Sequence, residues 1–217
     1  MFFRKSIIAL TGLFLCVFLI VHLSANSILV LPEKVARGLY NSYSTTLRES
    51  PLIKIVAYVL YLSIILHVVY ALWVTINNRK AKRKGYAINR SRENSSWASQ
   101  NMGLLGITVL LFIVVHLANF WARIKLGMGE GVGLDSKGHV DVYEVTYSLF
   151  QNSYYVIFYS LLMIPLGLHL HHGLKSAFMT LGFYHKKGLK ILAKVSLVYA
   201  AIMALGFGII PIIVFFK

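Results

Sequence analysis

Five apolar runs, each long enough to cross a bilayer, take up most of this chain of 217 residues. A helix needs about 20 predominantly apolar residues to cross the hydrocarbon core. Charged residues, proline, glycine or asparagine bound each run, and the bounds place five spans at residues 6–31, 52–76, 102–125, 154–180 and 189–216. Little chain is left for a second domain. The sequence therefore predicts an all-α fold, a single membrane domain (residues 1–217) of five transmembrane helices.

The composition of the chain also indicates a membrane protein. Apolar residues make up 58% of the chain and charged residues 13%, whereas a soluble domain averages roughly 45–50% and about 25%. The charged residues are too few to cover a water-facing surface. The single cysteine, Cys16, excludes an intramolecular disulfide framework, a Cys-ligated iron–sulfur cluster and a C-x-x-C-H site for covalent haem.

The first apolar run could be mistaken for a signal peptide because Arg4 and Lys5 precede it. The run is too long for the apolar region of a signal peptide, and no small-x-small cleavage site follows it. We therefore expect a retained helix.

The basic residues predict the orientation of the bundle. The chain has 22 Lys and Arg against 7 Asp and Glu. With the N-terminus in the cytoplasm, most basic residues fall inside, including Arg4, Lys5 and the run Arg79–Lys84, and every acid except Glu93 falls outside. The positive-inside rule then favours a cytoplasmic N-terminus and an outer C-terminus. The basic run lies between two spans, so it indicates topology, lipid headgroups or a cytoplasmic partner and not nucleic acid.

The chain has 8 histidines, more than its acids. Six of them lie inside the spans: His22, His67, His116, His169, His171 and His172. An imidazole inside a bilayer is costly and usually functional. A helix–helix hydrogen bond would explain any one of them alone, but it does not explain one histidine on each of four successive spans. His139 and His185 lie in loops, where we expect solvated side chains.

The expected depth of each histidine in the membrane divides four of them into two pairs. At about 1.5 Å per residue, His22 and His116 lie ~20–25 Å from the cytoplasmic edge, and His67 and His169 lie ~15–17 Å from it. Two histidines from facing helices at one depth are the arrangement that binds a bis-histidine haem in a bundle. Zinc suits the pattern less well, because it needs three or four converging ligands.

The fourth span offers three candidate ligands. Small residues follow two of the histidines at helical spacing, Ala71 after His67 and Gly173 after His169, and they would leave room for a porphyrin edge. Ordinary close helix packing explains them equally well. His171 lies on the far side of the helix, whereas His172 is near enough to compete. We choose His169.

The loop between the third and fourth spans contains two features. The glycine-rich segment 127–133 has no preceding strand, so we expect a flexible turn and not a nucleotide-binding loop. Asp141 and Glu144 then have the spacing of a capping box, and Val145 and Leu149 share one helical face. This pattern predicts a short amphipathic helix on the outer surface.

Six motifs in order along the chain carry a family resemblance: His22–Asn26, Leu66–Tyr70, the stretch from Asn101 to Trp121, Tyr143–Val145, Gly167–Gly173 and Ser176–Gly182. Over essentially its whole length the chain resembles the diheme cytochrome b membrane anchor of succinate dehydrogenase/fumarate reductase (complex II), in its single-subunit, five-helix form.

The resemblance implies a function and a site. It implies two b haems with the axial ligands His22, His67, His116 and His169, and a quinone, commonly menaquinone, as substrate. It also implies flavoprotein and iron–sulfur subunits on the cytoplasmic face of a bacterial inner membrane. The anchor would carry electrons and perform no dehydrogenation itself. Some members have a buried glutamate two residues before the fourth ligand. Gly167 stands there in this chain, so a carboxylate proton relay of that kind is not expected.

Two other functions stay open from the sequence. One is a haem b subunit of a different membrane oxidoreductase, such as a hydrogenase or formate dehydrogenase. The other is a histidine-based metal transporter, although the spans mostly lack the polar residues that would line its path. Five polar residues near the outer side are candidate partners for haem propionates or quinone oxygens, or are simply interface residues that reach toward water: Arg37, Tyr43, Arg48, Lys54 and Arg123.

Overall fold

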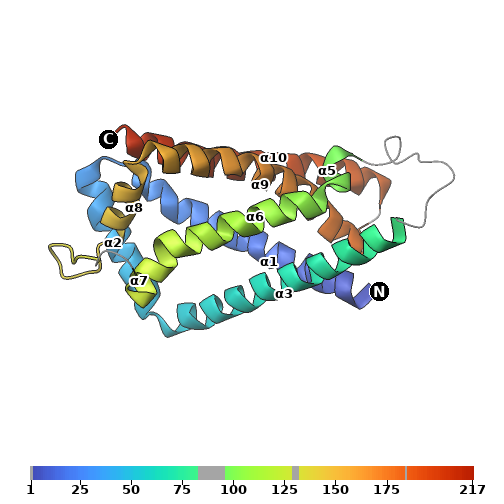
Figure 1. The fold of residues 1–217 in the computed structure, drawn as a ribbon, viewed down its shortest axis with the longest axis horizontal. Helices are drawn as coiled ribbons and strands as arrows, with labels where there is room; N and C mark the ends of the chain where they lie inside the picture. Colours follow the sequence, from blue (N-terminus) through green and yellow to red (C-terminus); the bar gives the residue numbers. More distant parts are fainter. Residues whose placement is uncertain (1, 83–95, 129–131, 184) are drawn as a thin grey trace.

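The computed structural model is a bundle of long helices with short helices at both ends (Figure 1). It describes residues 2–82, 96–128, 132–183 and 185–217. The long helices are α1 (Phe2–Asn26), α3 (Pro51–Lys82), α6 (Met102–His116), α9 (Ser153–Thr180) and α10 (Lys186–Phe215). After α6 the same helix continues through the π-helical segment η2 (Leu117–Ala122) into α7 (Arg123–Leu126).

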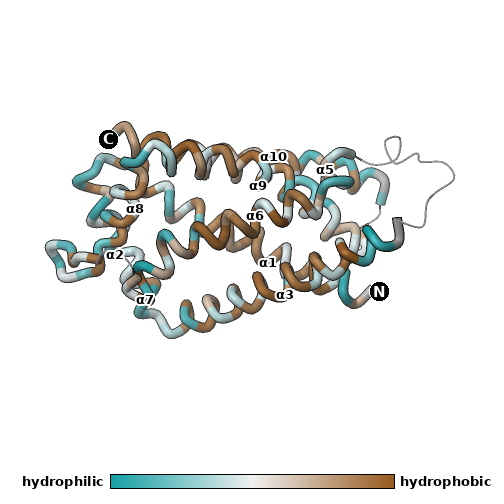
Figure 2. Tube along the Cα trace, viewed as in Figure 1, coloured by the Kyte–Doolittle hydropathy of each residue, from teal (hydrophilic) through white to brown (hydrophobic). Residues whose placement is uncertain are grey.

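Five helices are long and apolar enough to cross a membrane: Phe3–Val30, Pro51–Lys80, Met102–Leu126, Ser153–Thr180 and Lys187–Phe215. The predicted all-α, multi-pass membrane fold is confirmed. The second helix runs beyond the predicted end of its span at residue 76 to Lys82. The N-terminus and the C-terminus lie at opposite ends of the bundle (Figure 1), and apolar residues dominate its middle (Figure 2). The N-in, C-out orientation stays a prediction.

Parts of two predicted segments lie outside the described residues. Of the basic segment, the structure describes Arg79 and Lys80 at the end of α3 but not residues 83–95. Of the glycine-rich segment, it does not describe residues 129–131.

Helix α9 lies at the centre of the packing. It contacts α10 along much of its length and also contacts α1 and α6, while α3 packs mainly against α1. Small residues allow α9 and α10 to approach closely. A Cβ atom on Gly167 would lie 3.0 Å from the Cβ of Ala204. A buried cluster between these two helices includes Met163, Leu166 and Met203.

Three short elements cover the end of the bundle near the C-terminus (Figure 1). They are η1 (Ser27–Val30), α2 (Glu33–Glu49) and α8 (Val142–Phe150), and together we call them the cap. Helix α2 was not predicted from the sequence. It begins directly after Pro32, with an acid, Glu33, in its first turn, where the helix dipole favours negative charge.

The predicted helix after Asp141 is confirmed as α8. The Asp141 carboxylate accepts a hydrogen bond from the backbone N–H of Glu144 at 3.1 Å, as the capping-box spacing predicts. The expectation that this helix lies on the outer surface is wrong. Its side chains are mostly buried, among them Tyr143, Val145 and Phe150, because α2 covers one side and the ends of α9 and α10 lie against it.

Candidate functional site

A cavity of about 650 Å³ lies inside the bundle. Its lining runs from Lys5 near the N-terminal end to Phe150 of the cap and is mostly apolar. The volume falls within the range of about 300–1,000 Å³ typical of ligand pockets. All four predicted ligands line it: His22, His67, His116 and His169.

The four helices that carry these histidines surround the cavity in the order α1, α3, α6, α9. Each helix contacts the next one around the ring, and α9 closes the ring against α1. Helices α1 and α6 are therefore opposite each other, as are α3 and α9. The cavity separates the members of each opposite pair.

The histidines meet across this cavity along its two diagonals. The ring centroids of His22 and His116 lie 5.8 Å apart at an interplanar angle of 89°. Those of His67 and His169 lie 6.4 Å apart at 71°. The structure thus brings together the same two pairs that the depth estimate groups.

The spacing of the histidine pairs is close to that of two imidazoles on one metal atom: it falls within the expected range for His67 and His169 and slightly below it for His22 and His116. A metal–imidazole nitrogen bond is about 2.0–2.1 Å long, so two imidazoles on opposite sides of one metal atom have centroids about 6–6.5 Å apart. The observed separations are 5.8 and 6.4 Å. Within the described part of the chain, no group of three or more His, Cys, Asp or Glu side chains comes together to hold a metal. The donor set therefore suits two-ligand sites.

Two of the four imidazoles have an unpaired nitrogen. His116 Nδ1 and His169 Nδ1 are buried with no hydrogen-bond partner among the described residues. Buried polar atoms nearly always have a partner, and an exception calls for an explanation such as an absent bound group. No described residue therefore fixes the tautomer of these two imidazoles.

Glycines leave room beside the pair His67 and His169. A Cβ atom on Gly12 of α1 would lie 3.1 Å from His67 Cε1, closer than nearly all real contacts of this kind. A Cβ atom on Gly106 of α6 would lie 3.6 Å from His169 Cε1. The two small residues chosen from the sequence, Ala71 and Gly173, both line the cavity.

Aromatic rings surround the pair His22 and His116 instead. Phe18 stacks on His22 with centroids 5.2 Å apart, and Phe207 lies 5.6 Å from it. Phe120 lies 5.0 Å from His116. The two pairs thus have different surroundings, one rich in glycine and one rich in aromatic rings.

Asn26 connects His22 to the cap. Its amide nitrogen donates a hydrogen bond to the carbonyl oxygen of His22 at 2.8 Å, and its amide oxygen accepts one from the Tyr40 hydroxyl of α2 at 3.2 Å. Burial raises the pKa of Tyr40 to about 12, so the phenol keeps its proton at neutral pH.

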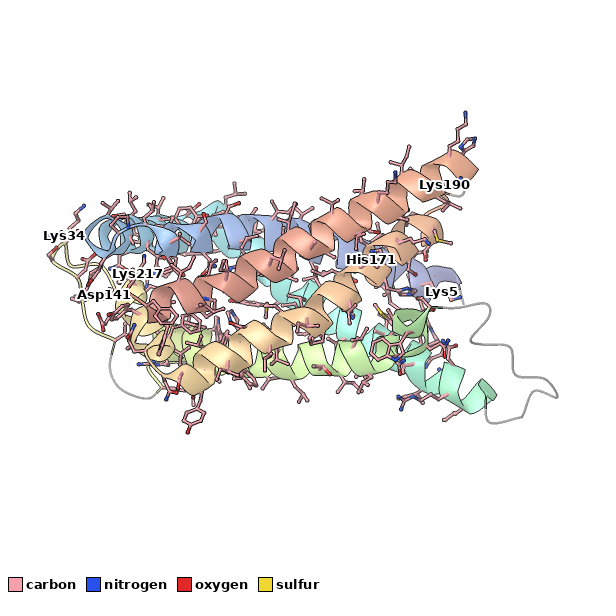
Figure 3. All side chains as sticks on the ribbon, turned by 90° about the horizontal axis from the view of Figure 1, so that it is seen from above. Lys5, Lys34, Asp141, His171, Lys190 and Lys217 are labelled. Carbon is pink, nitrogen blue, oxygen red and sulfur yellow. The ribbon has the colours of Figure 1, made fainter. Side chains whose placement is uncertain are left out.

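The other two histidines of α9 differ in position. His171 lies against α10, where its Nδ1 is 3.3 Å from the Ser196 hydroxyl (Figure 3 labels His171). His172 lines the cavity. The ring that meets His67 belongs to His169.

The cap contains a polar network that includes Arg37. Its guanidinium donates two hydrogen bonds to Asp141, at 2.6 and 3.0 Å, and lies 3.0 Å from Glu144. The fully buried Asn41 donates to Asp141 at 2.8 Å and accepts the backbone N–H of Tyr143 at 2.9 Å. Arg37, a candidate propionate or quinone partner from the sequence, therefore pairs with acids of the cap.

The network also sets the ionisation of Asp141. Burial opposes its negative charge, but hydrogen bonds from Asn41, Arg37 and the Glu144 N–H hold the pKa of this carboxyl below its usual value. Of the other outer candidates, Arg48 donates to Ser44 and Thr45 on its own helix. Arg48, Tyr43, Lys54 and Arg123 are not among the described residues that line the cavity.

Two features of the site were missed from the sequence. The helix changes from α to π geometry at Leu117, immediately after His116, and π-helical turns occur frequently at functional sites. The hydroxyl of Thr11 lies 3.2 Å from His67 Nδ1. The periodicity of apolar residues, from which the helices are predicted, indicates neither feature.

No family model matches the chain, and neither a curated protein nor a solved structure matches it. The resemblance to diheme cytochrome b anchors therefore stays an expectation from the sequence motifs.

Proposed function

We propose that this protein is the membrane anchor and electron-transfer subunit of a succinate:quinone oxidoreductase, with two b haems. The observation that supports it is that two histidine pairs from opposite helices meet in one apolar cavity, with ring centroids 5.8 and 6.4 Å apart. His22 and His116 would hold one haem, and His67 and His169 the other. Bound haem supplies reversible one-electron redox chemistry.

The protein's own contribution is ligation and environment. The imidazoles supply axial ligands, and the apolar lining excludes water, which influences the reduction potential of a buried haem. Glycines border one pair and aromatic rings the other, so the two sites would have different potentials. The described spans carry no Asp or Glu in their middle, so the proposal includes no carboxylate proton relay.

The N-terminal end of the bundle suits the soluble partners. Lys5 and Lys190 lie at this end, whereas Lys34, Asp141 and Lys217 lie at the other (Figure 3). By the positive-inside rule the basic end faces the cytoplasm. Flavoprotein and iron–sulfur subunits would dock there, and a membrane quinone, commonly menaquinone, would take or give the electrons in a bacterial inner membrane.

The experiment is purification of the protein from its native membrane, followed by a reduced-minus-oxidised spectrum and identification of what co-purifies. We expect low-spin b haem at about two per chain, together with a flavoprotein and an iron–sulfur subunit. Recovery with a hydrogenase or formate dehydrogenase subunit and without flavoprotein would contradict the complex II assignment. A protein that binds zinc or another metal and no haem would favour the transporter.

A further inference from the structure

Thr11 on α1 contacts Nδ1 of His67 on α3. This contact indicates which nitrogen of the imidazole carries its proton. The Thr11 hydroxyl oxygen lies 2.6 Å from the carbonyl oxygen of Ile7, 3.2 Å from that of Ile8 and 3.2 Å from Nδ1 of His67. The Ile8 carbonyl, also on α1, is a second acceptor that contacts His67. A hydroxyl has one proton to donate. At 2.6 Å from a carbonyl oxygen, which can only accept, that proton goes to Ile7. The hydroxyl oxygen can then only accept from His67, so Nδ1 carries the imidazole proton.

The position of this proton decides which nitrogen can bind a metal. A neutral imidazole has one N–H, so protonation at Nδ1 leaves a free lone pair on Nε2. We propose that Thr11 is a positioning residue that holds His67 in its Nδ1–H tautomer and presents Nε2 as the ligating nitrogen. Gly12, the next residue, supports this by leaving space for the ring, because its Cβ would lie 3.1 Å from His67 Cε1.

The other three ligands lack such a partner. His116 Nδ1 and His169 Nδ1 have no hydrogen-bond partner among the described residues. The Nδ1 of His22 lies 3.4 Å from the amide nitrogen of Asn26, which is a donor. His67 is therefore, of the four, the histidine whose Nδ1 meets a hydrogen-bond acceptor among the described residues, and this contact keeps the proton on Nδ1 before a metal arrives. The consequence for haem rests on the proposed function, whereas the tautomer of His67 does not.

The first experiment measures the tautomer in the full-length, haem-free protein in detergent, by NMR of ¹⁵N-labelled histidine. His67→Gln assigns the signal by removing it. We expect Nδ1–H in the parent protein, a mixture of tautomers in Thr11→Val, and the parent signal in Thr11→Ser. Thr108→Val is the matched control, because the Thr108 hydroxyl donates to Leu104 on an exposed face of α6. A parent His67 protonated at Nε2 would overturn the proposal, even if Thr11→Val fails to fold.

The second experiment is a redox titration of the haem-loaded variants. Loss of an outer hydrogen bond to a metal-bound histidine typically weakens metal binding about 10–100-fold and lowers the basicity of the ligand. Thr11→Val should therefore weaken retention of one haem about tenfold and raise its midpoint potential, while the other haem and the Thr108→Val control stay unchanged. Thr11→Ser should restore the parent values. Unchanged potentials in Thr11→Val, or an equal shift in Thr108→Val, would contradict the role of Thr11. If the parent protein holds no haem, the proposed function fails while the NMR result still decides the tautomer.

Discussion

His22 and His116 meet with ring centroids 5.8 Å apart, although their helices lie on opposite sides of the cavity. His67 and His169 repeat this relationship on the other diagonal at 6.4 Å. Neighbouring helices of the ring contact each other directly, α3 and α6 the least, whereas opposite helices meet through imidazoles. A group bound between the rings would therefore connect helices that otherwise have little contact.

If haem is bound between the rings as proposed, only the histidines that face the opposite helix should hold it. His171 serves as the control for that claim, because its Nδ1 contacts Ser196 of α10 and not the opposite helix. We expect His171→Ala to keep the haem content and the redox titration of the parent protein and to lose only about 0.5–1.5 kcal/mol, typical of one hydrogen bond. Haem quantification and thermal unfolding in detergent measure both quantities. Loss of a haem in His171→Ala would show that the histidine has been misassigned.

The two glycines beside His67 and His169 should respond differently to the same substitution. Gly12→Ala places a Cβ 3.1 Å from His67 Cε1, so the ring has to shift by a few tenths of an ångström and the haem of this pair should be held more weakly. Gly106→Ala places it 3.6 Å from His169 Cε1, an ordinary van der Waals distance, and should be tolerated. Haem content and the two-component redox titration compare them. Equal effects of the two variants would show that the space at Gly12 is unimportant.

Asn41 should be the most sensitive polar residue of the cap. It is fully buried and connects Asp141 to the backbone N–H of Tyr143. Asn41→Ala leaves both groups without this partner, so we expect about 1–3 kcal/mol of destabilisation and faster hydrogen exchange in α8. Asn77→Ala is the control, because among the described residues the half-buried Asn77 amide donates to the carbonyl of Trp73 on its own helix. Similar exchange in both variants would refute the role of Asn41.

The pKa of Asp141 gives the cap a pH dependence. Its folded pKa lies below its ordinary value, which is about 3.9 for an aspartate, so the folded state favours the carboxylate. The stability from this group is present above pH ~4 and disappears as the pH falls through the folded pKa. Hydrogen exchange of α8, followed from pH ~6 down to pH ~2, should show this loss below pH ~4, and Asp141→Asn should reduce it. Asp135→Asn is a necessary comparison, since the pKa of Asp135 is also lowered and its carboxylate accepts from Asn41. An unchanged pH profile in Asp141→Asn would contradict the assignment.

The spans and the pairing of the histidines could be predicted from the sequence, because hydropathy and the rise of a helix are regular over one segment. Counting residues from the membrane edge was enough to give His22 and His116 one depth. Helix α2 was missed because it is polar overall, and its buried face, with Ala36 and Asn41, exists only where α8 covers it. The pairing of Arg37 with Asp141 joins residues far apart in the chain.

The proton on His67 could not be predicted for a related reason. Which neighbour its Nδ1 meets depends on how α1 is rotated about its own axis relative to α3, and the apolar pattern of α1 does not specify that rotation. The same rotation places Thr11 and Gly12 against the ring. The π-helical turn after His116 likewise has no signature in the residues Leu117–Ala122.

The most direct test of the account measures haem per chain in two double variants. His67→Ala with His169→Ala removes both members of one diagonal pair, and we expect it to keep the other haem, about half of the parent content. His22→Ala with His67→Ala removes one member of each pair and should lose both haems. If the His22/His67 variant keeps a haem while the His67/His169 variant keeps none, or if the parent protein binds no haem, the diagonal pairing is wrong.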